Sequence, residues 1–318
     1  MQALFRHSLR TATRASPFQA SRAMAMATVS QNIMPCTYFN HGGGPMPLMG
    51  KQPEVANWCK EYGDKFKESP PKAIMVVSAH WEEDEVVKVG GSVEHDLYFD
   101  YYGFPSETYD YEYPAPGEPT VAAEAVRLLK EANVKVEMDT ERGWDHGVFV
   151  PLMCMFPEAK IPVVPVSVLT NQDAKQHIAI GQALAPLREQ GVLILGSGAS
   201  FHNFGYFRAK TAEEQEAGTK HSHHWADWLE KTMTSKNLTN EERLAALGDW
   251  EQAPSARACQ PPRQAEHLMP MFVIAGAARG EAAVTVGKKT EEDENNADMA
   301  SKWAGINTLV MSQFEFLK

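Results

Sequence analysis

The stretch AIMVVSAH, residues 73–80, decides the fold class of this chain. It is apolar almost throughout and lacks the alternation of a half-exposed strand, so it predicts a β-strand buried on both faces. Short apolar runs recur at MPCTYF (34–39), EVVKVGG (85–91), VKVEMD (134–139), IPVVPVSVL (161–169) and VLILGSG (192–198). Helical patterns separate them over 53–68, 119–132, 146–156 and 173–190. Strands that alternate with helices in this way are typical of an α/β fold.

The remaining segments fit one catalytic domain, which we expect over residues 31–318. Its expected core is a mostly parallel or mixed central sheet flanked by helices. The further expected elements are a polar helical region (209–250), an apolar helix (265–278), a closing strand MSQFEF (311–316), irregular loops (95–118 and 253–264) and a mobile charged segment (287–301).

Composition limits the possible partners. The formal net charge of −11 disfavours a nucleic-acid partner, which needs a basic surface to meet phosphates. No apolar run approaches the roughly 20 residues that cross a bilayer, so we expect no membrane partner. The cysteines are scattered without a CxxC pair, which predicts free thiols in a reducing compartment. They are Cys36, Cys59, Cys154 and Cys259.

Residues 1–30 differ in composition from the rest of the chain. They contain four arginines and several serines and threonines, and the first acidic residue of the chain is Glu54. An Arg-rich, acid-poor segment without a continuous apolar core is typical of a mitochondrial transit peptide. A disordered leader, or translation that begins at Met24, Met26 or Met34, is the alternative, and it leaves the protein cytoplasmic.

Three histidines follow three of the expected strands. His41 comes after MPCTYF, His80 ends AIMVVSAH, and His202 lies just beyond VLILGSG. In an open α/β sheet, ligands bind outside the carboxyl ends of the strands, so these imidazoles should meet at one edge. Glycines next to His41 and before His202 leave room beside the rings for a metal and a substrate. The sequence therefore predicts a metal site at the carboxyl ends of the strands.

Two further histidines, His146 and His267, lie near the starts of apolar helices. The positive end of a helix disfavours protonation of a nearby imidazole, and a neutral imidazole can bind a metal or accept a proton. Asp145 either orients His146 or caps the helix, and the sequence leaves both roles open. The other histidines favour structural or surface roles; they are His7, His95, His177, His221, His223 and His224.

Seven segments resemble, in order, the class III extradiol ring-cleaving dioxygenases, and more narrowly the DOPA dioxygenase branch of the family typified by the protocatechuate dioxygenase β subunit. The resemblance runs from about residue 34 to the C-terminus. The segments are YFNHGGGPMPLM, VVSAHWE, HDLYFDYYGFP, GWDHGVFVPLMCMFP, PVVPVSVL, LILGSGASFHN and AEHLMPMFVIAGAA.

The resemblance implies roles for five histidines. His41, His80 and His267 match metal ligands, and His202 matches the active-site acid/base, which can also approach the metal. His146 matches the histidine that contacts substrate and dioxygen. His267 replaces the glutamate of many class III enzymes, so the usual carboxylate of the facial triad is missing. Fe²⁺ is the expected metal, and Zn²⁺ suits an all-imidazole site equally well. Glu266 is a poor substitute ligand, because adjacent side chains on a helix do not share a face.

The implied activity is ring cleavage of a catechol such as DOPA, in which both atoms of dioxygen enter outside the diol. His202 would take a proton from the substrate, and His146 would contact the dioxygen-derived oxygen and later donate a proton. The aromatic residues of 98–113 either stack on the ring or simply pack the loop. A zinc hydrolase and a non-enzymatic Memo-type interaction protein are the alternative functions. The oligomeric state stays open.

Overall fold

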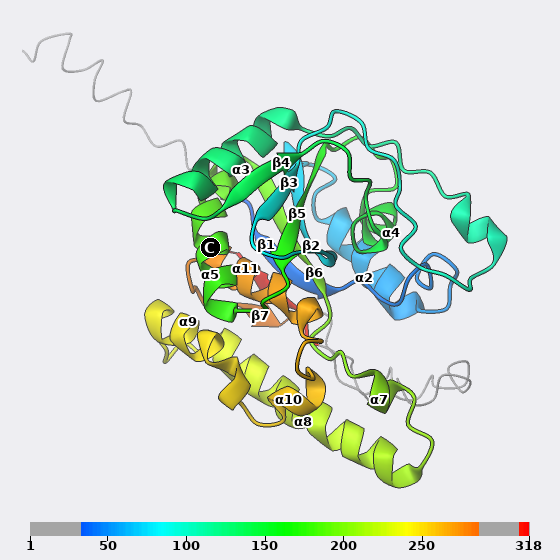
Figure 1. Cartoon of the computed structure of the whole chain (residues 1–318), viewed down its shortest axis with the longest axis vertical. Coiled ribbons are helices and arrows are strands. Elements are labelled where there is room, and N and C mark those ends of the chain that lie inside the picture. Colours follow the sequence, from blue (N-terminus) through cyan, green and yellow to red (C-terminus); the bar gives the residue numbers. More distant parts are fainter. Residues whose placement is uncertain (1–32, 286–311, 318) are drawn as a thin grey trace, which may run out of the picture. The chain divides into compact units, whose positions relative to one another are not determined.

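A mixed sheet runs through the computed structural model, which describes residues 33–285 and 312–317 (Figure 1). Its strand order is β4-β3-β5-β2-β6-β1-β8-β7. The strands are β1 (Cys36–Asn40), β2 (Ala73–Glu83), β3 (Val87–Gly90), β4 (Val136–Asp139), β5 (Val163–Leu169), β6 (Val192–Gly198), β7 (Val284–Thr285) and β8 (Phe314–Phe316). The α/β fold with a mixed sheet is confirmed.

The four central strands β5, β2, β6 and β1 are parallel, so their carboxyl ends lie at one edge of the sheet. On the outer sides β8 pairs with β1, and β3 with β5, in antiparallel fashion. The expected closing strand is therefore present as β8. The leader and the charged segment 287–301 lie outside the described residues.

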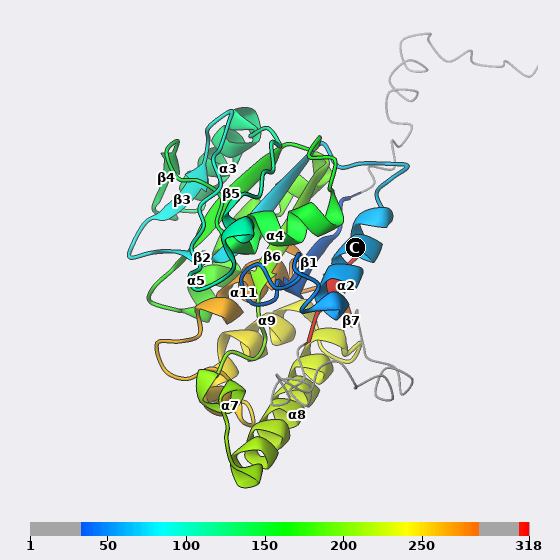
Figure 2. The same cartoon turned by 90° about the vertical axis from the view of Figure 1, so that its right-hand side faces the viewer.

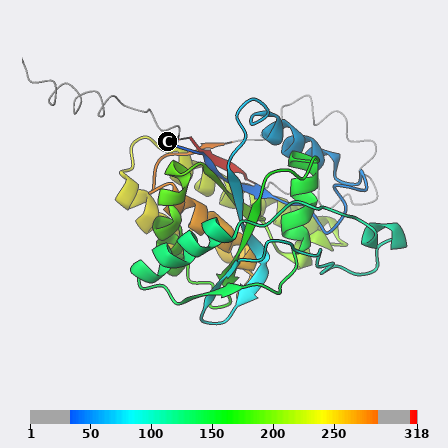
Figure 3. The same cartoon turned by 90° about the horizontal axis from the view of Figure 1, so that it is seen from above.

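Helices cover both faces of the sheet, as Figure 3 shows from above. Alternate strand residues enter two separate apolar cores. Met75 and Val77 belong to the core under α3, α5 and α11, whereas Ile74 and Val76 belong to the core under α2 and α4. The first helices are α2 (Pro53–Asp64), α3 (Pro119–Glu131), α4 (His146–Met155), α5 (Ala174–Leu184), α6 (Pro186–Glu189) and α7 (Phe204–Phe207).

The later helices are α8 (Ala212–Thr234), α9 (Asn240–Gly248), α10 (Ala256–Cys259) and α11 (Met269–Ala277), and the short 3-10 turns are η1 (Ser106–Tyr109), η2 (Trp250–Gln252) and η3 (Glu266–Leu268). In Figures 1 and 2, α8 and α9 lie together beside α11, below the sheet. None of the described helices has both the length and the apolar character that crossing a bilayer requires.

Three boundaries differ from the sequence prediction. The helix expected over 173–190 is divided into α5 and α6, because Pro186 has no N–H to continue the hydrogen-bond ladder. The helix expected over 53–68 ends at Asp64. The helix expected over 265–278 begins as the 3-10 turn η3, and Pro270 then occupies the first turn of α11. His267 therefore lies in the turn and not in the helix.

Strand β2 continues to Glu83, past the predicted end at residue 80. Its pairing with β6 stops at Ser78, and its register with β5 shifts between Val77 and Glu82. A shift of this kind redirects the side chains of the bulged strand. His80 lies within this irregular stretch, where β2 has separated from β6.

The residues predicted to be structural have ordinary roles. All four cysteines are free thiols. His223 and His224 are exposed on α8, and the half-buried His221 contacts the Ser255 hydroxyl through Nδ1 at 2.9 Å. His95 contacts the Arg142 carbonyl in the same way at 3.1 Å.

His177 links the end of β5 to the start of α5. Its Nδ1–H donates to the Asp173 carbonyl (2.7 Å), and its Nε2 accepts from the Leu169 amide (3.0 Å). Burial lowers the pKa of His177 from 6.5 to about 4, although the Asp173 carbonyl opposes this shift. The ring is therefore neutral in the folded protein at neutral pH.

This lowered pKa makes the fold sensitive to acid. Above pH 6.5 the ring is neutral in both states, whereas below it the unfolded chain binds a proton that the folded chain refuses until about pH 4. His177 should thus remove about 2 to 3 kcal/mol of stability between pH 7.5 and 4.5. Urea unfolding measures the free energy of unfolding at pH 7.5 and at pH 4.5. Between these pH values His177→Gln should lose about 2 to 3 kcal/mol less of it than wild type does. The exposed-residue control His223→Gln should behave as wild type; equal losses in all three proteins would contradict the assignment.

Candidate metal centre

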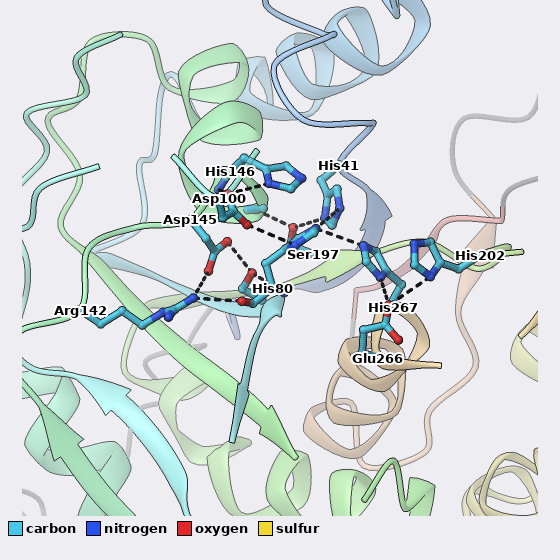
Figure 4. A network of polar contacts seen from close by, with 12 residues as sticks. His41, His80, Asp100, Arg142, Asp145, His146, Ser197, His202, Glu266 and His267 are labelled. Atoms are coloured by element: carbon cyan, nitrogen blue, oxygen red, sulfur yellow. Dashed lines mark hydrogen bonds and ion pairs between the residues drawn. The ribbon is translucent and has the colours of Figure 1, made fainter. Parts of the chain in front are cut away.

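Three imidazoles meet at the carboxyl edge of the parallel strands (Figure 4). His41 follows β1, and its amide donates to the Gly198 carbonyl of β6 (3.3 Å). His80 lies in the irregular part of β2, and His267 in η3. The Nε2 of His80 lies 3.3 Å from the Nε2 of His41 and 3.1 Å from the Nε2 of His267. The structure therefore brings together the three residues predicted as metal ligands.

The Nε2 atom of His41 carries a lone pair in this arrangement. The Ser197 hydroxyl donates its proton to the Gly147 carbonyl at 2.5 Å, so it can only accept from His41 Nδ1, 2.8 Å away. His41 is therefore protonated on Nδ1, and its unprotonated Nε2 faces the other two rings.

Asp100 contacts two of the histidines. Its Oδ1 accepts from the backbone N–H and the ring Nδ1 of His146, at 2.9 and 2.8 Å. Its Oδ2 lies 3.2 Å from Nδ1 of His80. The rings of His80 and His146 are close, with centroids 3.9 Å apart. His146, predicted to take part in catalysis, thus lies beside the three converging rings.

Glu266 makes a similar pair of contacts on the other side. Its Oε1 lies 2.8 Å from Nδ1 of His267 and 3.1 Å from Nδ1 of His202. The two rings are stacked, with centroids 3.7 Å apart and planes inclined by 23°. The sequence predicts that Glu266 points away from its neighbour, as adjacent residues do on an α-helix. Its side chain is long enough for the carboxylate to reach both histidines all the same.

Burial keeps the converging imidazoles neutral. Burial, reinforced by the charges of the neighbouring histidines, lowers the pKa values of His41 and His80 well below 6.5. Burial and the charge of His202 lower that of His267 to about 4, against the opposing effect of Glu266. Burial alone would raise the pKa of Glu266, but the hydrogen bond from His267 and the close approach of His202 outweigh it and leave the pKa well below 4.5. Neutral imidazoles beside a carboxylate are the form that binds metal ions.

The missing side chain of Gly198 places His267. A Cβ on Gly198 would lie 2.0 Å from the His267 carbonyl oxygen, so only glycine allows η3 to approach β6 this closely. The same carbonyl accepts from the Ala199 amide (3.0 Å) and the Tyr38 hydroxyl (3.1 Å). In the turn after His41, Gly42 and Gly44 adopt the left-handed conformation that favours glycine.

Asp145 does not cap α4 through its side chain. Its carboxylate accepts from the Ser78 hydroxyl (2.7 Å) and lies 3.5 Å from Arg142. Burial and the charge of Asp100 raise its pKa. The sequence left open whether Asp145 orients His146 or caps α4. Its side chain does neither, and Asp100 orients His146 instead.

The sequence analysis missed Asp100, Ser197 and Arg142. Arg142 donates to the His80 carbonyl (2.9 Å) and so fixes the backbone of a converging histidine. Asp100 lies in an acidic, aromatic loop, where nothing distinguishes it from neighbouring acids. Ser197 was visible only as one of the small residues before His202.

The donor atoms fit a metal ion. Ligand nitrogens about 2.1 Å from a metal lie about 3.0 to 3.4 Å apart at octahedral or tetrahedral angles, which matches the two Nε2 separations. Around this point the groups able to hold a metal are His41, His80 and His146 on one side, and His202, Glu266 and His267 on the other. Imidazole ligands suit iron and zinc.

Comparison with known proteins agrees with this chemistry. Residues 35–303 match the family described as the catalytic LigB subunit of aromatic ring-opening dioxygenase. The chain belongs to the LigB family of extradiol dioxygenases. The expected family resemblance is thereby confirmed, and it spans nearly all of the described residues.

Two relatives support the family membership, and one solved structure shares the fold. Dioxygenase tasH of Hapsidospora irregularis is 36% identical over 277 residues, which cover 81% of this chain and 82% of that protein. The 4,5-DOPA dioxygenase extradiol of Beta vulgaris is 35% identical over 247 residues, with 76% and 86% covered. The crystal structure of an uncharacterized Escherichia coli K12 protein shares the fold, with a TM-score of 0.64, 24% identity, and 89% and 99% covered.

The Ser197 hydroxyl should be needed for tight metal binding. In Ser197→Ala the Nδ1 of His41 loses its acceptor, so the ring can place its proton on Nε2 and no longer offer a lone pair. We expect Zn²⁺ affinity to fall about 10-fold, as measured by competition with a chromophoric chelator. Ser92→Ala, in the loop that follows β3, is the control and should bind as wild type; an unchanged affinity in Ser197→Ala would contradict the tautomer assignment.

Proposed function

We propose that this LigB-family protein opens the ring of a catechol such as DOPA, with Fe²⁺ as the working metal. The observation that carries the proposal is the convergence of the His41, His80 and His267 Nε2 atoms at 3.1 and 3.3 Å. Nitrogens this close need a shared proton or a cation between them, and His80 Nε2 has at most one proton for its two neighbours, whereas one metal ion can serve all three rings. The relatives named as 4,5-DOPA dioxygenases support the choice of substrate.

Bound Fe²⁺ would act as a Lewis acid that holds the catechol hydroxyls and dioxygen next to each other. The residues of the chain would manage the protons. The Nδ1 of His202 faces Glu266, which leaves Nε2 to take a proton from a substrate hydroxyl. Because its ring stacks on His267, the proton acceptor lies directly beside a metal ligand.

His146 would serve the dioxygen side. Asp100 holds its Nδ1, so Nε2 would contact the oxygen atoms, and it could return a proton to them after taking one from the second hydroxyl of the catechol. The carbon–carbon bond next to the diol breaks, and the two atoms of dioxygen enter the product, which carries an aldehyde and a carboxylate. No outside reductant is needed, because the catechol supplies the electrons.

One assay tests the proposal. The protein is loaded with Fe²⁺ under anaerobic conditions, DOPA or a simpler catechol is added, oxygen is admitted, and oxygen uptake and yellow product are followed. We expect one oxygen molecule consumed for each catechol opened. Absence of uptake with every catechol would refute the dioxygenase activity. Ester hydrolysis by the zinc form would instead identify a hydrolase, and inactivity with both metals would favour a Memo-type interaction protein.

Two variants separate the proposed roles within the same assay. His41→Ala should lose the metal outright, because a ligand is removed. His202→Ala should retain most of the metal but lose turnover by about 100-fold or more, since a general base contributes about that much. Loss of metal from His202→Ala would identify His202 as a ligand first.

We also propose import into mitochondria, on the basis of the composition of residues 1–30 alone. Protein purified from its native source should then begin near residue 30 when its N-terminus is sequenced. A mature protein that begins at Met1 would refute import.

A further inference from the structure

Two partly buried carboxylates occupy equivalent places around the candidate metal centre (Figure 4). Each contacts the Nδ1 of one expected ligand and the Nδ1 of one expected proton-transfer histidine. Asp100 joins His80 to His146, and Glu266 joins His267 to His202. Their side chains are only 10% and 16% exposed, so solvent screens them weakly. Neither was predicted to take part in the chemistry.

We propose that Asp100 and Glu266 are positioning residues that set the tautomers of these four histidines and neutralise the metal charge. The inference rests on the proposed metal centre. Hydrogen bonds link Asp100 to His146 and Glu266 to His267, whereas Nδ1 of His80 and Nδ1 of His202 lie 3.2 and 3.1 Å from a carboxylate oxygen without hydrogen-bond alignment. An ionised carboxylate presents only lone pairs and would repel an unprotonated Nδ1 at either distance, so a neutral imidazole that faces it carries its proton on Nδ1. Nε2 of each ring is then left with a lone pair, for metal binding in His80 and His267 and for proton transfer in His146 and His202.

The same carboxylates resolve a problem of charge. Three neutral imidazoles leave the full charge of a divalent cation, whereas the usual facial triad contributes one negative ligand. Asp100 and Glu266 together supply two negative charges without binding the metal directly. His267 takes the place of a negatively charged ligand. The negative charge lost in this way is supplied by Asp100 and Glu266, which contact the far nitrogen of the ligand rings.

The two sites respond differently to amide substitution. Asp100 uses Oδ1 for His146 and Oδ2 for His80, so an amide in its place would offer an N–H to one of the rings. Glu266 serves both of its histidines through Oε1 alone, so a glutamine keeps the acceptor and removes only the charge. Asp100→Asn therefore disturbs tautomer and charge, and Glu266→Gln disturbs charge alone.

The experiment measures metal binding and tautomers without turnover. Zn²⁺ affinity is determined by chelator competition, and ¹⁵N–¹H correlation of ¹⁵N-histidine-labelled protein reports which ring nitrogen carries the proton. We expect about 100-fold weaker binding for Asp100→Asn and about 10-fold for Glu266→Gln. A shift of the His80 proton from Nδ1 to Nε2 is expected only in Asp100→Asn.

Glu82→Gln is the matched control. Glu82 lies close enough to Glu266 and His202 for charge interaction but contacts no histidine ring, so its loss should change affinity by less than about threefold. If all three variants lost the same Zn²⁺ affinity, the loss would reflect only the removal of a nearby negative charge, and the proposal would be overturned.

Wild-type protein alone also tests the inference, so variants that fail to fold do not decide it. Signals assigned to His80 and His267 must show the proton on Nδ1; a proton on Nε2 of either would overturn the assignment. Failure of wild-type protein to bind Zn²⁺, Co²⁺ or Fe²⁺ would instead refute the metal centre itself. Tight metal binding with unaffected variants would refute only the role of the carboxylates.

Discussion

The close approach of η3 to the end of β6 is the constraint on which the whole centre depends. The His267 carbonyl lies against Gly198, and it accepts from the Ala199 amide and the Tyr38 hydroxyl. Gly198 and Tyr38 belong to β6 and β1, the strands that also carry Ser197 and lead into His41, and Ala199 directly follows β6. Helix α11 follows at once, and all of its residues are buried. The packing of an entirely apolar helix thus fixes one imidazole relative to the strands that place the others.

The sequence predicted the sheet and the edge at which the histidines meet, because both follow from simple periodicity. A continuously apolar strand must be buried, and parallel strands present their carboxyl ends together. His41 and His80 could therefore be placed from their positions after apolar runs. The 3-10 turn at His267 and the division of the helix at Pro186 could not, since boundaries depend on local hydrogen bonds that a hydrophobic pattern does not record.

Contacts between residues far apart in the chain were beyond sequence reasoning. Asp100 reaches His146 across 46 positions, and Ser197 reaches His41 across 156. Both are residue types that are common in loops and turns, so neither stands out by composition. Glu266 was misjudged for a different reason: its Cβ diverges from that of His267, but its longer side chain brings the carboxylate back to Nδ1 of its neighbour. Side-chain hydrogen bonds thus determine the part of the site that periodicity leaves undefined.

Five histidines gathered in one interior region come at a cost in stability. Burial disfavours the charged forms of His41, His80 and His267, and lone pairs aimed at one point repel. Such an arrangement persists only where the surrounding structure enforces it. The buried strands and α11 supply that rigidity, as is common for functional sites whose polar groups are poorly satisfied without their ligand.

Asp100 lies in the irregular segment 95–118, which single bridges attach to the body of the protein at Leu97–Trp144 and Gly117–Val163. A group that holds two site histidines is therefore carried by a segment with little regular structure of its own. If Asp100 supports the centre as proposed, the closed form of this segment and the filled centre belong to one thermodynamic cycle, so each must favour the other by the same free energy. A change that loosens the segment, however far from the histidines, then weakens the centre, and a filled centre orders the segment that forms its wall.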